Sequence, residues 1–150
     1  MKLYIAYGSN LNAEQMKRRC PTAKLAGTGV LENCALYFRR MSSQAYATIH
    51  PQSGAYVPVA FWEIDQDAED ALDLYEGYPR FYYKQTLPLA QADGQEREAM
   101  VYVMNDKAVP GIPSRYYVQT IYQGYLDVGL NIDEFKKICK NCGFELKDMI

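Results

Sequence analysis

Apolar residues recur with two different periods along this chain, and each period predicts a different kind of element. Alternating or continuous apolar runs rich in Tyr, Val and Ile indicate β-strands. Gly8 ends the first of these runs, and Pro58 predicts an edge position or a bulge in another. The segment Ala92-Asp93-Gly94 is typical of a hairpin turn between the last two runs. The runs expected to form strands are residues 2–7, 30–39, 46–49, 56–64, 82–89 and 98–104.

Helical spacing of the apolar residues predicts four helices, and most of them have a recognisable start or stop. Asn12 with Gln15 three residues later has the form of a helix start, and Ser114 can cap another helix. Gly77 and Pro79 end the helix that begins at Asp65. The helices are expected over residues 12–19, 65–76, 114–129 and 133–142.

The order of these elements predicts the fold class. A strand and a helix are followed by several strands, another helix, two strands and two helices. Irregular alternation with consecutive β runs favours an α+β fold with a mixed, mostly antiparallel sheet over a parallel doubly wound sheet. Residues 1–150 contain no repeat, linker or low-complexity segment, so we expect a single domain.

Charge and composition narrow the class of partner. Sixteen Lys and Arg against 18 Asp and Glu give a net charge of −2, which provides no field for a nucleic-acid backbone. No run approaches the roughly 18 apolar residues of a membrane helix. The apolar run after Lys2 is too short for a signal peptide, so we expect a cytoplasmic protein. Fourteen tyrosines are the unusual feature, because they combine ring area with a hydroxyl.

The pair Cys139 and Cys142 has the CxxC spacing of redox and zinc sites. It falls at the end of a predicted helix rather than after a strand, and Cys20 and Cys34 are too far apart to complete a zinc site. We therefore expect reduced thiols and no metal, with a thiol or metal function kept as an alternative. The single histidine, His50, is expected in an exposed loop.

Two segments could carry chemistry. The first, Tyr7-Gly8-Ser9-Asn10-Leu11, joins a strand to a helix and could direct backbone N–H groups at a small anion such as a carboxylate. It lacks the Lys-Ser/Thr ending of a P-loop and the three glycines of a dinucleotide site. An ordinary strand-to-helix turn explains the same residues.

The second segment is Tyr75-Glu76-Gly77-Tyr78-Pro79. Glu76 lies at the carboxyl end of its helix, where the dipole disfavours negative charge, and Asp73 is close enough to repel it. The aromatic neighbours Tyr75, Tyr78 and Phe81 would reduce the hydration of the Glu76 carboxylate. All three effects raise a carboxyl pKa, which suits a general acid/base. The alternative is a solvent-exposed carboxylate beside a glycine cap.

Taken together, these segments resemble the γ-glutamylcyclotransferase family, and particularly the small bacterial members of its AIG2-like branch. The resemblance covers roughly Leu3 to Phe135. Four motifs in the same order carry it: Tyr7-Gly8-Ser9-Asn10-Leu11; Ala47-Thr48-Ile49 with Gly54 and Val57; Leu72-Asp73-x-Tyr75-Glu76-Gly77-Tyr78-Pro79 with Tyr83; and Pro113-Ser114-x-x-Tyr117 with Gly124 and Gly129-Leu130.

The resemblance implies a small β-barrel-like sheet flanked by helices and a specific set of site residues. The loop Tyr7–Leu11, comprising Tyr7, Gly8, Ser9, Asn10 and Leu11, would bind the glutamyl part of the substrate. Glu76 would be the catalytic acid/base. Tyr83 and Tyr117 would line the cavity. Many relatives have glycine where Val59 stands, so the strand near the pocket is expected to differ in shape.

The implied reaction is attack of the substrate's α-amine on its own γ-amide carbonyl, which releases 5-oxoproline and an amine. It needs no metal, nucleotide or redox cofactor, and its partner is a small γ-glutamyl molecule. The compatible leaving groups are a free amino acid, a lysine side chain, a polyamine-like amine and an acylated natural product. The sequence does not indicate an oligomeric state. The alternative on the same fold is a non-catalytic protein that binds a small γ-glutamyl or amino-acid-like ligand.

Overall fold

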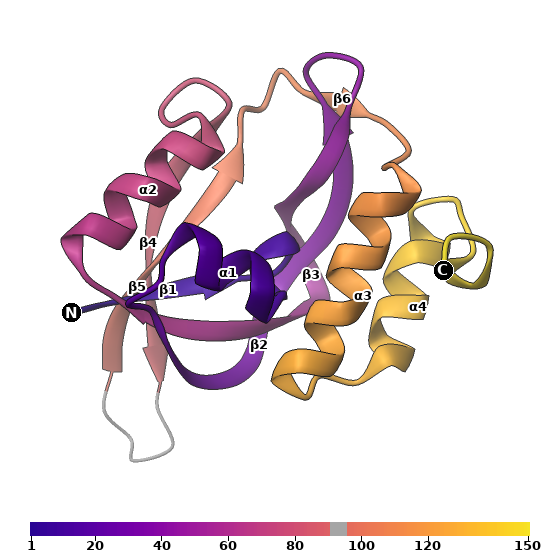
Figure 1. Cartoon of the computed structure of the whole chain (residues 1–150). Coiled ribbons are helices and arrows are strands. Elements are labelled where there is room, and N and C mark those ends of the chain that lie inside the picture. The colour runs from indigo at the N-terminus through magenta and orange to yellow at the C-terminus, as the bar shows by residue number, and fades with distance from the viewer. Residues whose placement is uncertain (91–95) are drawn as a thin grey trace.

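A curled six-stranded sheet with helices against it forms the fold (Figure 1). The computed structural model describes residues 1–90 and 96–150. The strands lie in the order β4-β5-β1-β3-β2-β6. They are β1 (Lys2–Ala6), β2 (Lys24–Arg40), β3 (Ala45–Ile64), β4 (Tyr82–Ala90), β5 (Glu96–Met104) and β6 (Val109–Pro110).

The α+β class with a mixed, mostly antiparallel sheet is confirmed. Among the described residues, β1 and β5 pair in parallel, and the other four strand pairs are antiparallel. β1 lies between β5 and β3, and its residues from Leu3 to Ala6 are buried. A strand covered on both faces needs a continuous apolar run rather than an alternating one. The first run of the sequence has that character.

The long hairpin of β2 and β3 differs from the prediction. Residues 46–49 and 56–64 were expected as separate strands, but β3 is continuous from Ala45 to Ile64 and β2 begins at Lys24. The polar residues between the two runs stay in the ladder, where His50 pairs with Ala35 and is not in a loop. Exposed ladder positions accept polar side chains, so the apolar pattern fades there although pairing continues.

Pro58 faces Val30 of β2, two residues beyond the last pair that joins β3 to β1. A proline is tolerated there because its missing N–H leaves no ladder bond unmade on the β1 side. The predicted turn Ala92-Asp93-Gly94 between β4 and β5 lies outside the described residues.

The predicted helix starts are confirmed by their caps. The side chains of Asn12, Asp65 and Ser114 accept hydrogen bonds from the backbone N–H groups of residues 15, 68 and 117. The helices are α1 (Ala13–Arg19), α2 (Gln66–Glu76), α3 (Arg115–Val128) and α4 (Ile132–Asn141), with short 3-10 helices η1 (Ser9–Leu11) and η2 (Leu146–Asp148). None of the helices within residues 1–90 and 96–150 is long and apolar enough to cross a membrane.

α3 packs directly on the η1 segment. A side chain at Gly124 would place its Cβ 2.7 Å from the backbone nitrogen of Asn12 and 2.7 Å from the Cβ of Leu11. Asn12 also donates a hydrogen bond from Nδ2 to the carbonyl of Thr120 on the same helix. The glycine is therefore what allows α3 to approach the chain between β1 and α1.

We expect Gly124→Ala to destabilise the protein by about 1–3 kcal/mol, because the added methyl meets backbone atoms that cannot move aside independently. This exceeds the gain of about 1 kcal/mol that alanine has over glycine within a helix. The neighbouring exposed substitution Gln123→Ala should change stability by less than about 0.5 kcal/mol. Urea unfolding measures both. A Gly124→Ala protein as stable as the parent would contradict the close contact.

Candidate active site

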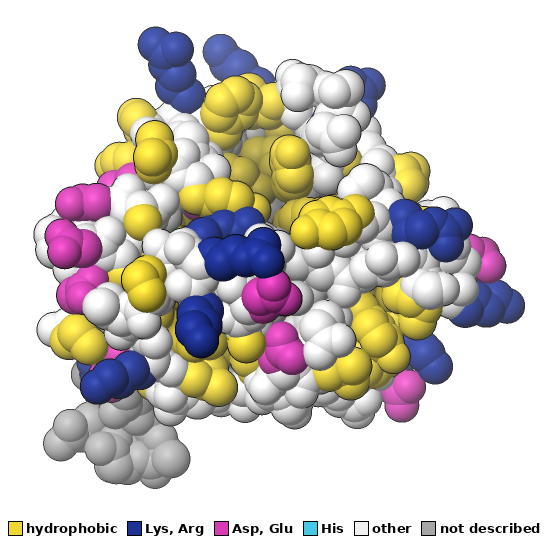
Figure 2. All heavy atoms as spheres, in the orientation of Figure 1, with side chains coloured by type: hydrophobic (Ala, Val, Ile, Leu, Met, Phe, Trp, Pro, Cys, Tyr) yellow, Lys and Arg dark blue, Asp and Glu magenta, His cyan; other side chains and the backbone are white. Residues whose placement is uncertain are grey.

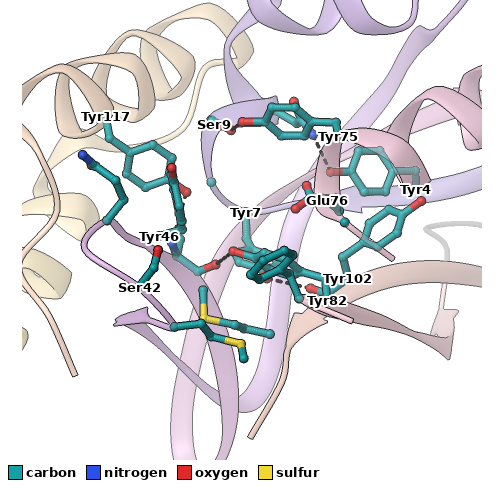
Figure 3. A pocket seen from close by; sticks show the side chains of 18 residues that line it. Tyr4, Tyr7, Ser9, Ser42, Tyr46, Tyr75, Glu76, Tyr82, Tyr102 and Tyr117 are labelled. Carbon is teal, nitrogen blue, oxygen red and sulfur yellow. Dashed lines mark hydrogen bonds between the residues drawn. The ribbon is translucent and has the colours of Figure 1, made fainter. Parts of the chain in front are cut away.

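A cavity of about 330 Å³ opens where the curled sheet, η1 and the end of α2 meet (Figure 2). Its walls come from segments far apart in the sequence: β1 and η1, the tip of the β2–β3 hairpin, α2, β4, β5 and α3. Half of the 14 tyrosines line it, and Figure 3 shows their side chains. They are Tyr4, Tyr7, Tyr46, Tyr75, Tyr82, Tyr102 and Tyr117.

Glu76 is the one charged side chain among the described residues of the lining. It is the last residue of α2, and Gly77 follows in the left-handed conformation (φ 65°), which turns the chain away from the helix. The carboxylate is half-buried and lies among tyrosine rings (Figure 3). Burial raises its pKa from 4.5 to about 7, and the positive charge of Arg19 opposes that rise.

The predicted repulsion between Asp73 and Glu76 is wrong as the cause of this shift. Asp73 is compensated by other groups: Lys84 lies 2.9 Å from its Oδ1, and the hydroxyl of Tyr102 donates to the same oxygen at 2.6 Å. Loss of water around Glu76 is the largest cause. Of the aromatic neighbours expected to exclude that water, Tyr75 and Phe81 line the cavity. Tyr78 is not in the described lining and lies beside the Lys84 ammonium instead.

The loop Tyr7–Leu11 reaches the cavity through Tyr7, Gly8, Ser9 and Asn10. At Gly8, an added Cβ would lie 3.3 Å from both the Tyr117 hydroxyl and the Cβ of Ala47, so close approach explains this glycine. The N–H of Leu11 already donates to the Gly8 carbonyl.

Leu11 itself is outside the cavity lining, which differs from the prediction that the whole motif contacts substrate. Its side chain is fully buried in the core, against α3. In the 3-10 turn of η1, successive side chains point in different directions, so one residue of the motif anchors the loop while its neighbours face the cavity.

Arg19 joins the two halves of the site, and sequence reasoning did not single it out. Its Nη1 donates to the Oδ1 of Asn10 at 2.5 Å, and its guanidinium carbon lies 3.5 Å from the centre of the Tyr75 ring. The arginine therefore connects the loop to the residue that precedes Glu76. Its place as the last residue of α1, the helix that follows the motif, was the only available signal.

Tyr83 does not line the cavity in the described structure, whereas its neighbour Tyr82 does. Successive side chains of a strand point to opposite faces, so only one of the two can enter. Tyr83 is exposed on β4, while Tyr82 is buried. Tyr117, one turn into α3, lines the cavity as expected. Tyr4, Tyr46, Tyr82 and Tyr102 were missed because the apolar pattern of a strand does not reveal which of its rings surround a cavity.

The buried hydroxyls hold their protons at neutral pH. Burial raises the pKa values of Tyr7, Tyr82 and Tyr102 well above their ordinary range, and the charge of Glu76 contributes to each. Each of these hydroxyls donates to a protein oxygen: the Tyr102 carbonyl, the Ala47 carbonyl and the Asp73 carboxylate, respectively. The cavity thus offers neutral hydrogen-bonding groups around one carboxyl that titrates near pH 7.

The cysteine pair gives no support to a thiol function. Cys139 is buried, and burial raises its pKa to about 12; burial also raises the pKa of Cys142. A reactive cysteine needs the opposite shift. No group of three or more metal-ligating side chains is found within the described ranges. Val59 is fully buried and lies outside the cavity lining.

Comparisons with known proteins agree on one family. The sequence matches "Gamma-glutamyl cyclotransferase, AIG2-like" over residues 4–119. Gamma-glutamylcyclotransferases of Bos taurus and Homo sapiens are each 30% identical over 145 residues, which cover 91% of this chain and 76% of each relative. A solved structure named Gamma-glutamyl cyclotransferase superposes with a TM-score of 0.81 at 27% identity, covering 91% of this chain and 85% of the other.

The raised pKa of Glu76 predicts a pH-dependent effect on stability. A carboxyl whose pKa is higher in the folded state stabilises the fold below its unfolded value of 4.5, and that stability is lost as the pH rises through about 7. Glu76→Gln should therefore raise the free energy of unfolding by about 1–3 kcal/mol at pH 8, with most of the gain absent at pH 5.

Urea unfolding at both pH values measures this difference. Glu145→Gln, an exposed substitution, serves as the control and should give no such pH-dependent gain. Equal stability of Glu76→Gln and the parent at pH 8 would show that the carboxyl is not held in a poorly hydrated place.

Proposed function

The chain belongs to the gamma-glutamyl cyclotransferase, AIG2-like family, and from that premise we propose how its cavity carries out the cyclisation. The substrate is a γ-glutamyl amide. Its α-amine attacks its own γ-carbonyl carbon, a five-membered ring closes, and 5-oxoproline and an amine are released. The nucleophile is tethered to its target, so folding the chain back gives an effective concentration on the order of 10⁵ M or more.

Glu76 is the proposed acid/base. The substrate amine enters as an ammonium and cannot attack until a base removes a proton. Over the reaction the α-nitrogen loses two protons, and the leaving nitrogen, released as an ammonium near neutral pH, gains two. Glu76 would carry these protons from one nitrogen to the other. A carboxyl with a pKa of about 7 both accepts and returns a proton readily at neutral pH.

The loop residues Gly8, Ser9 and Asn10 are proposed to hold the glutamyl part. All three line the cavity, and Asn10 is fixed from two directions. Its amide oxygen accepts from Arg19, and its backbone carbonyl accepts from the indole N–H of Trp62 at 3.0 Å. A loop fixed in this way presents its polar groups without having to be ordered by the substrate.

The single observation that carries this proposal is the placement of Glu76. Burial of a lone carboxyl at the end of a helix costs stability, and a pKa of about 7 leaves it only partly ionised at neutral pH, which makes it a weak permanent partner for a bound ammonium. A proton-transferring enzyme requires such a group. No observation on this structure favours the non-catalytic binding protein over the enzyme.

We expect the protein to release 5-oxoproline from at least one member of a panel of γ-glutamyl amides. The panel contains γ-glutamyl amino acids, γ-glutamyl-ε-lysine, γ-glutamyl polyamines and γ-glutamyl alkylamides. Glu76→Gln should lower kcat by at least about 100-fold, since general acid–base catalysis contributes that much or more. Glu145→Gln is the matched control. Chromatographic detection of 5-oxoproline measures the activity of the parent and of each variant. A fully active Glu76→Gln protein would contradict the role of Glu76 as the general acid/base.

The pH profile tests the same residue independently. The ionised carboxylate is the base, so kcat/KM should rise with pH through an apparent pKa near 7. Arg19 lowers the pKa of Glu76, and hence Arg19→Gln should move this acid limb to higher pH while Arg19→Lys moves it less. The neighbours of Glu76 include Arg19 and the hydroxyls of Tyr4 and Tyr7, whose raised pKa values keep them protonated in this range. An unmoved profile in Arg19→Gln would contradict the electrostatic contact.

A further inference from the structure

Five of the seven tyrosine hydroxyls of the described cavity make a hydrogen bond of defined direction, and these five fall into two groups. A hydroxyl has one proton to donate and can accept as well. Those of Tyr7, Tyr82 and Tyr102 give their proton to a protein oxygen. Those of Tyr4 and Tyr117 instead accept from an N–H donor, so their own proton remains available.

Ala47 of β3 shows the contrast within one residue. Its carbonyl accepts from the Tyr82 hydroxyl at 2.8 Å, and its N–H donates to the Tyr117 hydroxyl at 3.0 Å. The two tyrosines therefore make bonds of opposite polarity to the same peptide segment. The Tyr82 proton is consumed by that bond, whereas the Tyr117 bond fixes the oxygen and leaves the proton to point elsewhere.

Of the two hydroxyls that accept from an N–H group, Tyr117 is placed for the substrate. Its oxygen lies 3.3 Å from the position of a Cβ on Gly8, directly against the loop that is proposed to hold the glutamyl part. Tyr4 lies at the other end of the group: Asn10 donates to its hydroxyl at 2.9 Å, and Glu76 is its main charged neighbour. Figure 3 shows Tyr4 beside Glu76 and Tyr117 on the far side of the cavity.

We propose that the Tyr117 hydroxyl donates a hydrogen bond to the γ-carbonyl oxygen of the substrate as that oxygen becomes negatively charged. The inference rests on the proposed cyclotransferase function. It gives Tyr117 a catalytic role across the cavity from Glu76, as a donor aimed at the oxygen on which charge develops.

The chemical step balances with this donor in place. The α-nitrogen forms a bond to the γ-carbon, and the carbonyl π electrons move to oxygen, which accepts the Tyr117 hydrogen bond. The carbonyl then re-forms, and the bond to the leaving nitrogen breaks as that nitrogen takes a proton from Glu76. The Tyr117 proton is shared but never transferred. Burial raises the pKa of Tyr117 far above neutrality, which keeps it a donor throughout.

Tyr117→Phe and Tyr82→Phe form a matched pair for the test. Each removes one hydroxyl and one bond to the backbone of Ala47, so both should lower Tm. Only Tyr117→Phe should lower kcat strongly, by about 100-fold or more with KM changed less than about threefold, because an oxyanion donor acts in the transition state. Tyr82→Phe should lower kcat at least about tenfold less than Tyr117→Phe does, because its hydroxyl proton is already given to the Ala47 carbonyl. The apparent pKa of the Glu76 limb should stay near 7 in both.

Three results would overturn the proposal while leaving the cyclotransferase function in place: equal kcat in the two variants, full kcat in Tyr117→Phe, or a rise in KM alone in Tyr117→Phe. The last result would mean that the hydroxyl binds the ground-state substrate, for instance its α-carboxylate. If the parent released no 5-oxoproline from any amide of the panel, the proposed function and this inference would fail together.

A second variant covers the case in which Tyr117→Phe does not fold. Replacing Tyr117 by 3-fluorotyrosine keeps the ring, the hydroxyl and the bond from Ala47, and it makes the hydroxyl a stronger donor. We expect kcat to rise with KM unchanged. A kcat equal to or below that of the parent would overturn the role.

Discussion

Immobilisation of the short chain between β1 and α1 is the constraint on which the rest of the site depends. Gly8 lies against Tyr117, Asn10 is bonded by Trp62 and Arg19, and Asn12 is bonded to α3, which Gly124 allows to approach. The strand β3 and the helices α1 and α3 thus hold this short segment at three of its residues. Because the loop cannot relax independently, its cavity-facing groups keep their geometry before any substrate arrives.

The end of strand pairing accounts for the tyrosines at Ala47. β1 pairs with β3 over residues 60–64, and Ala47 lies far beyond that pairing. The N–H and C=O of one residue in an antiparallel strand point to the same side, so a position without a neighbouring strand has two polar groups to satisfy. Tyr82 and Tyr117 satisfy one each. A structural requirement of the sheet edge thereby fixes the direction of two hydroxyl protons inside the cavity.

Local patterns carried much of the prediction, and contacts across the fold account for what they missed. Helix caps at Asn12 and Ser114 depend on residues three apart, so the sequence displays them directly. The perturbed state of Glu76 was expected, but for a partly wrong reason, because Lys84 compensates Asp73 only once β4 folds back beside α2. Choosing Tyr82 over Tyr83 required the register of β4, which no local pattern gives. The role of Arg19 likewise exists only once α1 and α2 are in contact.

Glu76 also shows why such a group persists at a cost to the fold. Above its pKa the carboxylate is charged in a poorly hydrated cavity, and Arg19 offsets only part of that penalty. If Glu76 had a close counter-charge, as Asp73 has in Lys84, its pKa would return toward the ordinary value of a carboxyl. Glu76 could then no longer return a proton readily at neutral pH. The near-neutral pKa therefore requires incomplete compensation. The ion pair between Lys84 of β4 and Asp73 of α2 lies one helical turn before Glu76 and leaves the Glu76 carboxylate without a full counter-charge.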